Sequence, residues 1–397
     1  MLMVSDLLEV AQRRQSPDEL ASRSAHFPTH ARAPVVVWNV CRHCNMKCPH
    51  CYAAATTTSA QNDMDTMEAI GVLETLAQGG VKVVIFSGGE PLLRRDIVEL
   101  ITHATKLGIA PHLSSNGSLI DVGVASRLKA AGLAYVGVSL DGTAQFNDTY
   151  RGMTGGFRLA VRALKACREV GIRTGVRLTL TRRNASQVNA VLSVARRHGA
   201  ARFYVSHLVY AGRALRLLDD DLSPSESRSA LLALFHLGEE LLSMGESIRL
   251  VSGGNDSAGV FLLRYVEERY GREAGARIRR LLALRGGNSA GQGILAVDSR
   301  GRVHPDQFWR GVTLGNLRRQ SVAEVLASPV ASALRDRVSR LTGRCGTCAY
   351  QDLCRGSHRE RALAAHGDMW APDPACVLED AEIQRAAPGT DAPSARR

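Results

Sequence analysis

Residues 38–52 read WNVCRHCNMKCPHCY and contain three cysteines, Cys44, Cys48 and Cys51, separated by three and then two residues. A short loop with this spacing can direct three thiolates toward one point. Iron–sulfur clusters are normally held by four cysteine thiolates. Three thiolates on a four-iron cluster leave one iron open, so the stretch predicts a [4Fe-4S] cluster to which a further molecule can bind.

Zinc and disulfide bonds are the alternatives for these cysteines. Cys41 and Cys44, like Cys48 and Cys51, form CxxC pairs, but only three residues separate the two pairs. Zinc modules usually place such pairs about 12–20 residues apart. Disulfides are disfavoured because residues 1–20 carry four acidic residues and lack the apolar segment of a secretory signal. We therefore expect a cytoplasmic protein with reduced thiols, in which Cys41 is a bystander.

The composition indicates a globular chain of 397 residues, long enough for two domains. No apolar run reaches the length of a membrane span, so no membrane partner is expected. The net charge is +12, but Lys and Arg form no long run and aromatic residues are only 5%. A stacking platform for bases is not evident, and no nucleic-acid partner is expected. The positive charge leaves two interpretations, a solvated basic surface or an anionic small substrate.

Strand and helix patterns alternate from residue 34 onwards. Buried strands are predicted at 34–39, 81–86, 110–114, 134–140, 173–180 and 201–207. Asp65 and Asp96 precede two of the helical patterns between them, where an Asp side chain can cap a helix. This alternation predicts an α/β fold with a parallel sheet. Six repeats are fewer than the eight of a closed TIM barrel, and the cysteine loop follows the first strand at the end where such folds place their chemistry.

The cysteine spacing, followed directly by the aromatic residue Tyr52, resembles the signature of the radical S-adenosylmethionine (SAM) enzymes. The resemblance implies that the three cysteines hold a catalytic [4Fe-4S] cluster and that SAM chelates its open iron. In that family an electron from the cluster splits SAM into methionine and a 5′-deoxyadenosyl radical. The implied fold is a partial, TIM-like (β/α)6 barrel, which agrees with the count of repeats.

Further segments at predicted strand ends resemble those that line the SAM pocket in this family. Glycines in the Ser-Gly-Gly-Glu segment let a ligand approach the backbone, and its carbonyls and carboxylate can accept from an ammonium group. Alone, each segment is an ordinary strand-to-helix turn, and Arg151 could equally form a surface salt bridge. By resemblance the SAM-binding residues are Tyr52, Ser87, Gly88, Gly89, Glu90, Asn116, Ser139, Asp141 and Arg151.

A second cysteine group lies near the C-terminus and comprises Cys345, Cys348, Cys354 and Cys376. Four thiolates fill a metal site completely, so structural zinc is a serious competitor for an iron–sulfur cluster. The spacing resembles the SPASM-type extension of radical SAM enzymes. That resemblance implies an auxiliary [4Fe-4S] cluster, with a role in electron transfer or in anchoring one edge of the pocket.

Segments outside the cluster motifs resemble one subfamily, the radical SAM enzymes of heme d1 biosynthesis (NirJ). They are residues 35–39, 203–208, 254–256, 302–309, 314–316 and 373–376. The resemblance covers residues from about 34 to 383, with departures at Cys41 and Arg310. It implies removal of propionate side chains from 12,18-didecarboxysiroheme, with flavodoxin or ferredoxin as electron donor. His207, His304 and His358 are candidates to approach the substrate iron, although an ordinary hydrogen-bonded role is expected for each.

An anionic tetrapyrrole suits a basic protein, because Arg pairs bidentately with carboxylates. The alternatives are a related enzyme of the heme pathway (a deacetylase or decarboxylase), a peptide maturase, and a non-enzymatic Cys-rich metal-binding protein. The expected organisation is an N-terminal helix and linker (1–33), the partial barrel (34–215), a helical connection (216–290), the auxiliary-cluster domain (291–383) and a disordered tail (384–397).

Overall fold

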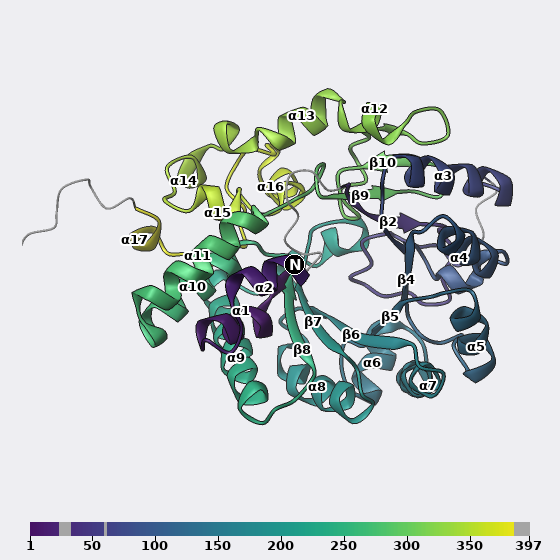
Figure 1. Ribbon diagram of the computed structural model, residues 1–397, viewed down its shortest axis with the longest axis horizontal. Helices are drawn as coiled ribbons and strands as arrows, with labels where there is room; N and C mark the ends of the chain where they lie inside the picture. The colour runs from purple at the N-terminus through teal and green to yellow at the C-terminus, as the bar shows by residue number, and fades with distance from the viewer. Residues whose placement is uncertain (24–32, 59–61, 385–397) are drawn as a thin grey trace, which may run out of the picture.

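The computed structural model describes residues 1–23, 33–58 and 62–384 (Figure 1). The predicted linker falls largely on residues 24–32, and the predicted disordered tail on residues 385–397, so both lie outside the described residues. No helix among the described residues is long and apolar enough to span a membrane.

All six predicted strands are confirmed. They are β2 (Val35–Asn39), β3 (Val83–Ser87), β4 (Ala110–Ser115), β5 (Tyr135–Ser139), β6 (Arg173–Leu180) and β7 (Arg202–His207). Each pairs in parallel with the next. Side chains alternate between the two faces of a strand, and those of Val36 and Trp38 enter the hydrophobic core. Trp38 stacks on its register partner Phe86 with ring centroids 5.9 Å apart.

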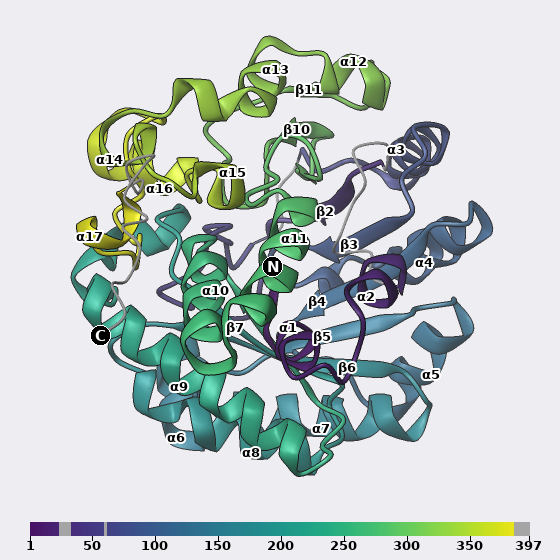
Figure 2. The same ribbon diagram turned by 60° about the vertical axis from the view of Figure 1, so that its left-hand side comes forward.

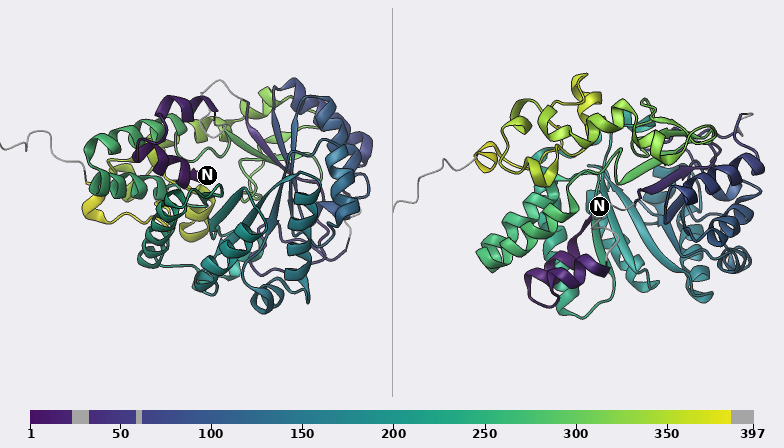
Figure 3. Two further views of the ribbon diagram at one scale, coloured as in Figure 1. Left: turned by 60° about the horizontal axis from the view of Figure 1, so that its bottom comes forward. Right: turned by 45° about the horizontal axis from the view of Figure 1, so that its top comes forward.

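Helices between these strands cover the outer face of the sheet (Figures 1 and 3). They are α3 (Thr66–Gln78), α4 (Ile97–Lys106), α5 (Val122–Ala130), α6 (Ala144–Arg151), α7 (Gly156–Glu169) and α8 (Val188–Arg197), with the 3-10 turns η1 (Pro91–Leu93) and η2 (Ala185–Gln187). Asp65 caps α3 in a capping box with Glu68. Asp96 occupies the corresponding position of α4 but makes no cap, because its carboxylate instead accepts from the guanidinium of Arg94 at 2.7 and 2.8 Å.

Two further parallel strands extend the sheet beyond the six predicted ones. They are β8 (Arg249–Gly253), which pairs with β7, and β9 (Ile294–Val297), which pairs with β2. The sequence pattern had suggested a mostly helical segment with a glycine-rich break at the position of β8. Its apolar run is short, and short runs do not distinguish strand from helix. The predicted hairpin of β9 with β10 (Arg302–His304) is confirmed as an antiparallel pair.

Antiparallel strands complete both edges of the sheet. They are β1 (Leu2–Met3), paired with β8, and β11 (Gly315–Asn316), paired with β10. The order is β1-β8-β7-β6-β5-β4-β3-β2-β9-β10-β11, so the parallel strands form an open barrel. This confirms the partial-barrel α/β fold, with a larger sheet than expected.

Helices of the connecting segment and the N-terminus pack together beside β8 (Figure 2). They are α1 (Val4–Ala11), α2 (Pro17–Arg23), α9 (Pro224–Ser243), α10 (Ser257–Tyr270) and α11 (Arg272–Arg285), preceded by η3 (Gly212–Arg216) and η4 (Leu218–Asp220). The C-terminal elements lie together along one side of the barrel (Figure 2). They are α12 (Val322–Leu326), α13 (Pro329–Arg335), η5 (Arg337–Arg340), α14 (Gly343–Gly346), α15 (Gln351–Cys354), α16 (Arg359–His366) and α17 (Asp380–Ile383).

Candidate active site

The cysteine loop continues the pairing of β2 with β3 beyond the ends of both strands. The N–H of Gly89 donates to the carbonyl of Cys41 at 2.9 Å, and the N–H of Glu90 donates to the carbonyl of His43 at 2.7 Å. Both strands end at the same edge of the sheet because they are parallel. The predicted SAM-binding turn after β3 therefore lies directly against the start of the cysteine loop.

Close backbone approach explains the two glycines of this turn. Gly88 has φ +134°, a conformation that L side chains rarely adopt, and a Cβ there would overlap the carbonyl oxygen of Cys41. A Cβ on Gly89 would overlap the carbonyl oxygen of His43. The glycines are thus required by the packing of the turn against the cysteine loop, whether or not they also admit a ligand.

The Glu90 carboxylate is fully buried and has three hydrogen-bond donors. It accepts from the Ser115 hydroxyl at 2.9 Å, from the N–H of Asn116 at 2.8 Å and from the N–H of Leu92 at 3.2 Å. Burial raises the pKa of Glu90, although these hydrogen bonds oppose the shift. Glu90 therefore joins the turn after β3 to the end of β4, and its expected contact with an ammonium group stays a prediction.

The Asn116 side chain reaches into the cysteine loop from the end of β4. Its Nδ2 donates to Asn45 Oδ1 at 2.8 Å and lies 3.9 Å from Cys44 Sγ. Its Oδ1 accepts from the N–H and the hydroxyl of Ser118 at 2.9 and 2.6 Å, and Asn45 donates to the same hydroxyl. Asn116 thus fixes the segment between the first two cysteines.

Three buried charged or polar side chains meet beside the cysteine loop. Asp141 Oδ2, at the end of β5, lies 3.1 Å from His50 Nε2 and 3.5 Å from Arg151 Nη1. Burial alone would raise the pKa of Asp141, but His50 and Arg151 outweigh it and hold the pKa at about 2. Arg151 Nε and Nη1 and His50 Nδ1 have no hydrogen-bond partner among the described residues. These buried donors are free to bind an anionic or polar ligand.

The thiols of the cysteine loop lie close to one another and to Arg151. Burial raises the pKa of Cys44 to about 11, and the nearby Cys48 and Cys51 add to the shift. Burial also raises the pKa of Cys48, while the Arg151 cation opposes it. Thiolates are the form that binds metals, so adjacent positive charge favours the ligand state. Three converging thiols beside a buried cation fit an iron–sulfur cluster. Cys41 hydrogen-bonds to the Glu90 carbonyl at 3.4 Å instead.

Tyr52 and Ser139 occupy different environments at the strand ends. The Tyr52 hydroxyl donates to Asn39 Oδ1 at 3.1 Å and lies 3.0 Å from Ser87 Oγ, so it ties the end of the cysteine loop to β2 and β3. The half-buried Ser139 hydroxyl makes no hydrogen bond among the described residues. Ser139 remains available to a ligand, whereas Tyr52 and Ser87 already satisfy each other.

Two arginines that the sequence did not indicate hold the carbonyls of the cysteine loop. Arg213, on η3, donates to the carbonyl oxygens of Cys48 at 2.8 Å and Ala55 at 2.7 Å. Arg310 donates to the carbonyl of Ala53 at 2.8 Å. Neither belongs to a recognisable motif, although Arg310 was noted as a departure from the subfamily pattern. Only the fold brings them to this loop.

The second cysteine group also comes together. Burial raises the pKa of all four thiols, and in each case at least one other member of the group adds to the shift. Within residues 1–23, 33–58 and 62–384, no three His, Cys, Asp or Glu side chains lie close enough to hold a single metal ion. In a four-iron cluster each thiolate binds a different iron, so its ligands lie further apart than those of one ion.

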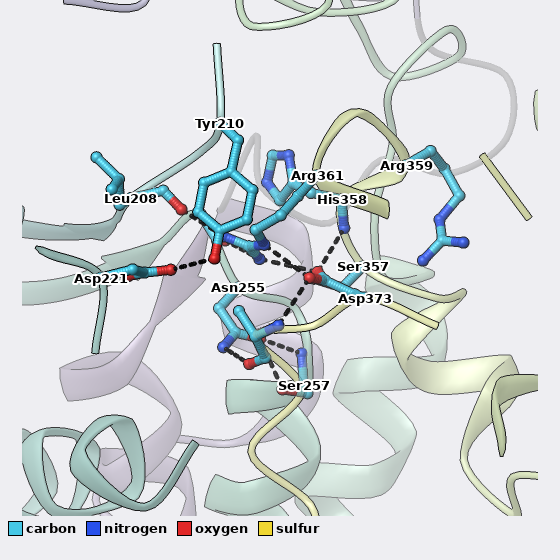
Figure 4. Close-up of polar contacts among 12 residues, drawn as sticks. Leu208, Tyr210, Asp221, Asn255, Ser257, Ser357, His358, Arg359, Arg361 and Asp373 are labelled. Atoms are coloured by element: carbon cyan, nitrogen blue, oxygen red, sulfur yellow. Dashed lines mark hydrogen bonds and ion pairs between the residues drawn. The ribbon is translucent and has the colours of Figure 1, made fainter. Parts of the chain in front are cut away.

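A buried ion pair joins this C-terminal region to the barrel (Figure 4). Arg361 binds Asp373 through two hydrogen bonds of 2.6 and 2.8 Å and also donates to the carbonyls of Leu208 and Gly254, beyond the ends of β7 and β8. Asp373 in turn accepts from the N–H of Ala375 at 3.1 Å. The pair therefore anchors the segment that leads into Cys376.

The three candidate histidines differ in their environments. Burial and the Arg361 cation lower the pKa of His207 to about 4, so its ring is neutral. His304 Nδ1 lies 2.7 Å from the carbonyl oxygen of Val312. The buried Nδ1 of His358 has no hydrogen-bond partner among the described residues, and its ring packs edge-on against Phe308, with centroids 5.6 Å apart.

Family models and relatives agree with this geometry. The model of the radical SAM superfamily matches residues 38–194, and that of an iron–sulfur cluster-binding domain (SPASM) matches residues 289–349. An Fe-coproporphyrin III synthase of Methanosarcina barkeri is 39% identical over 91% of this chain and 93% of its own. A pre-heme d1 synthase of Dinoroseobacter shibae is 37% identical over 89% of this chain and 88% of its own. An AdoMet-dependent heme synthase of M. barkeri is 30% identical over 86% and 96%.

Solved structures share the fold at low sequence identity. Streptococcus suis SuiB bound to S-adenosylmethionine has a TM-score of 0.68 and 17% identity, covering 88% of this chain and 78% of its own. The native anSMEcpe structure with bound AdoMet has a TM-score of 0.65 and 20% identity, covering 86% and 94%. Fold and family models together define a radical SAM enzyme with a C-terminal SPASM domain.

More narrowly, the chain belongs to the radical SAM family of heme-synthesis enzymes, because it aligns with those relatives over nearly their whole length. Its cofactors are a SAM-binding [4Fe-4S] cluster, SAM and an auxiliary iron–sulfur cluster.

Proposed function

We propose that this enzyme removes carboxylate-bearing side chains from an iron tetrapyrrole of the didecarboxysiroheme class. The observation that carries the proposal is the alignment with two synthases named for iron tetrapyrroles, at 37–39% identity over about nine-tenths of the chain. The first candidate reaction is the heme d1 one, the loss of propionate side chains from 12,18-didecarboxysiroheme. The segments cited from 203–208 to 373–376 favour it.

A second candidate is favoured by the 39% identity to the Fe-coproporphyrin III synthase. In that reaction acetate side chains would be converted to methyl groups. Both reactions act on side chains that no general base could deprotonate at neutral pH. When bound, the cluster and SAM supply a 5′-deoxyadenosyl radical that abstracts hydrogen from such a carbon.

The chain's own residues would bind and orient these groups. Cys44, Cys48 and Cys51 would ligate the catalytic cluster, and Cys345, Cys348, Cys354 and Cys376 the auxiliary one. The unpartnered donors of Arg151 and the free hydroxyl of Ser139 are placed to bind polar groups of SAM. Asp141 would hold Arg151 in place, and Glu90, Asn116 and Tyr52 would fix the loops around the pocket, with Ser87, Gly88 and Gly89 forming its turn.

Electrons would come from a small donor such as flavodoxin or ferredoxin in the cytoplasm, where the thiols stay reduced. The division of the chain into units at 34–215, 216–290 and 291–383 forms part of the same proposal.

An anaerobic turnover assay tests the function. Reconstituted protein is incubated with SAM, a strong reductant and didecarboxysiroheme, and 5′-deoxyadenosine and tetrapyrrole masses are followed by liquid chromatography and mass spectrometry. Mass loss from propionates, abolished by Cys44→Ala, supports the heme d1 reaction, and acetate-to-methyl conversion supports the second candidate. SAM cleavage with unchanged tetrapyrrole would overturn the substrate assignment.

A further inference from the structure

Arg177 projects from the inner face of the barrel. Its neighbours on β6, Val176 and Leu178, are buried in the hydrophobic core, on the face covered by α7 and α8. Because side chains alternate along a strand, Arg177 lies on the opposite face and is only half-buried. In register it pairs with Ser139 on β5 and with Tyr204 on β7, near the carboxyl ends of the strands.

The guanidinium of Arg177 is held in one place by the adjacent strands. It lies across Gly137 of β5, where a Cβ would overlap its Nε. Its Nη1 donates to Ser114 Oγ, on β4, at 2.7 Å. Tyr135 and Tyr204 lie in the same way across Gly175 and Gly253 of their neighbouring strands. The inner face is therefore lined by polar side chains that lie flat on the sheet, and Arg177 is ordered by them.

Arg177 has no acidic partner in the part of the chain that the structure describes. Its one hydrogen bond is to the neutral Ser114, so most of its N–H donors are unused. The nearest titratable side chain below it, His112, is kept neutral: burial and then the cations of Arg177, Arg202 and Arg173 lower the pKa of His112 to about 4. The positive charge on this face is thus not neutralised by the protein around it.

Arg177 also faces the catalytic end of the barrel. Burial raises the pKa of Tyr52, and the Arg177 cation opposes that shift, so its charge acts at the residue that follows Cys51. Ser139, with its free hydroxyl, is the register partner of Arg177. A ligand seated against the cysteine loop would therefore lie within reach of both side chains.

We propose that Arg177 binds a carboxylate of a ligand held inside the barrel. A planar guanidinium with unused donors pairs bidentately with a carboxylate. Two molecules could supply that group: the methionine part of SAM, or a side chain of the substrate. The substrate source rests on the proposed function, in which the substrate is a tetrapyrrole with several carboxylates. Arg151, beside the cysteine loop, is a separate cation and is not part of this site.

Arg177→Gln and Arg177→Lys test the proposal, with Arg158→Gln, on the exposed side of α7, as the matched control. Iron content and circular dichroism first confirm that each variant folds. Affinities are then measured anaerobically for SAM by equilibrium dialysis, and for Fe-coproporphyrin III and its methyl ester by absorbance titration. A lost charged hydrogen-bond pair is worth roughly a tenfold to hundredfold loss of affinity. Lys keeps the charge without the fork, so an intermediate loss is expected.

Each outcome decides the proposal. Weaker binding of the acid by Arg177→Gln, with unchanged SAM affinity and less discrimination against the ester, assigns the carboxylate to the substrate. Weaker SAM binding assigns it to methionine. Unchanged affinity for both overturns the proposal. If the wild-type protein binds no tetrapyrrole, the proposed function fails, and the SAM measurement alone decides the role of Arg177.

Discussion

Arg361 and Asp373 form a two-hydrogen-bond ion pair in which both side chains are fully buried, with distances of 2.6 and 2.8 Å. Burial alone would raise the pKa of Asp373, but Arg361 outweighs it and holds the pKa well below its usual range. The same guanidinium binds carbonyls beyond β7 and β8. One side chain thus connects the barrel to the chain that carries the last cysteine.

Asp373→Asn should destabilise the enzyme strongly, because it leaves the buried Arg361 cation without its counter-charge. Loss of one partner of a buried pair costs about 3–5 kcal/mol of unfolding free energy. The auxiliary cluster should also be lost, since Cys376 follows the anchored segment, while the catalytic cluster persists. Denaturant unfolding and iron analysis measure both effects.

The matched control is Asp18→Asn, which breaks an Asp–Arg pair at a similar distance, 2.8 Å, but on the surface. Exposed pairs contribute about 0–1 kcal/mol, so this variant should retain full iron content and near wild-type stability. Equal stability losses in the two variants would contradict the role given to Arg361 and Asp373.

Gly89→Ala should abolish the catalytic cluster, because the added Cβ overlaps the carbonyl oxygen of His43 and pushes the turn away from the cysteine loop. Gly71→Ala is the control: Gly71 lies within α3 and has open space around its Cβ position. That change should keep the cluster and stabilise the helix by about 0.5–1 kcal/mol. Iron content and SAM cleavage are the measurements, and a fully loaded Gly89→Ala enzyme would refute the packing argument.

Arg213→Met should loosen the cysteine loop, because the carbonyls of Cys48 and Ala55 lose their donor. We expect faster release of iron to a chelator and slower SAM cleavage, with a stability loss of about 1–3 kcal/mol. Arg216→Met, on the exposed side of the same 3-10 helix, is the control and should behave like the wild type. Identical chelation rates for the two variants would show that Arg213 does not hold the loop.

Local patterns sufficed for the six central strands and for the helices between them, because each strand is an apolar run bounded by turn residues. They did not suffice for β8, whose five residues, Arg249–Gly253, are recognisable only from their pairing with β7. Asp96 shows a related limit. It stands at the first position of α4, yet a neighbouring Arg94 claims its carboxylate.

The candidate site divides in the same way. The cysteines and the Ser-Gly-Gly-Glu turn are marked by spacing within short segments. Arg213 is separated from Cys48 by 165 residues, and Arg361 from Leu208 by 153, so no local spacing could connect them. The free charge of Arg177 was equally hidden, because it depends on the absence of a carboxylate across neighbouring strands.

Glu360 gives the protein a pH-dependent stability. Burial, with the Asp306 carboxylate adding to it, raises the pKa of Glu360 to about 8 from an ordinary value of 4.5. Between these values the folded state keeps its proton while the unfolded state releases it. The contribution of Glu360 to the unfolding free energy is therefore greatest below pH 4.5 and is lost as the pH rises toward 8.

Glu360→Gln removes the ionisation but keeps the shape of the side chain. It should match the wild type in unfolding free energy at pH 5 and exceed it at pH 9, since an amide is not forced to become a buried charge. Anaerobic urea unfolding at pH 5, 7 and 9 measures the difference. Glu169→Gln, at an exposed position on α7, should instead follow the wild-type curve at a constant offset. If Glu360→Gln also ran parallel to the wild type, the carboxyl would be titrating normally, and burial beside Asp306 would have no effect on its proton.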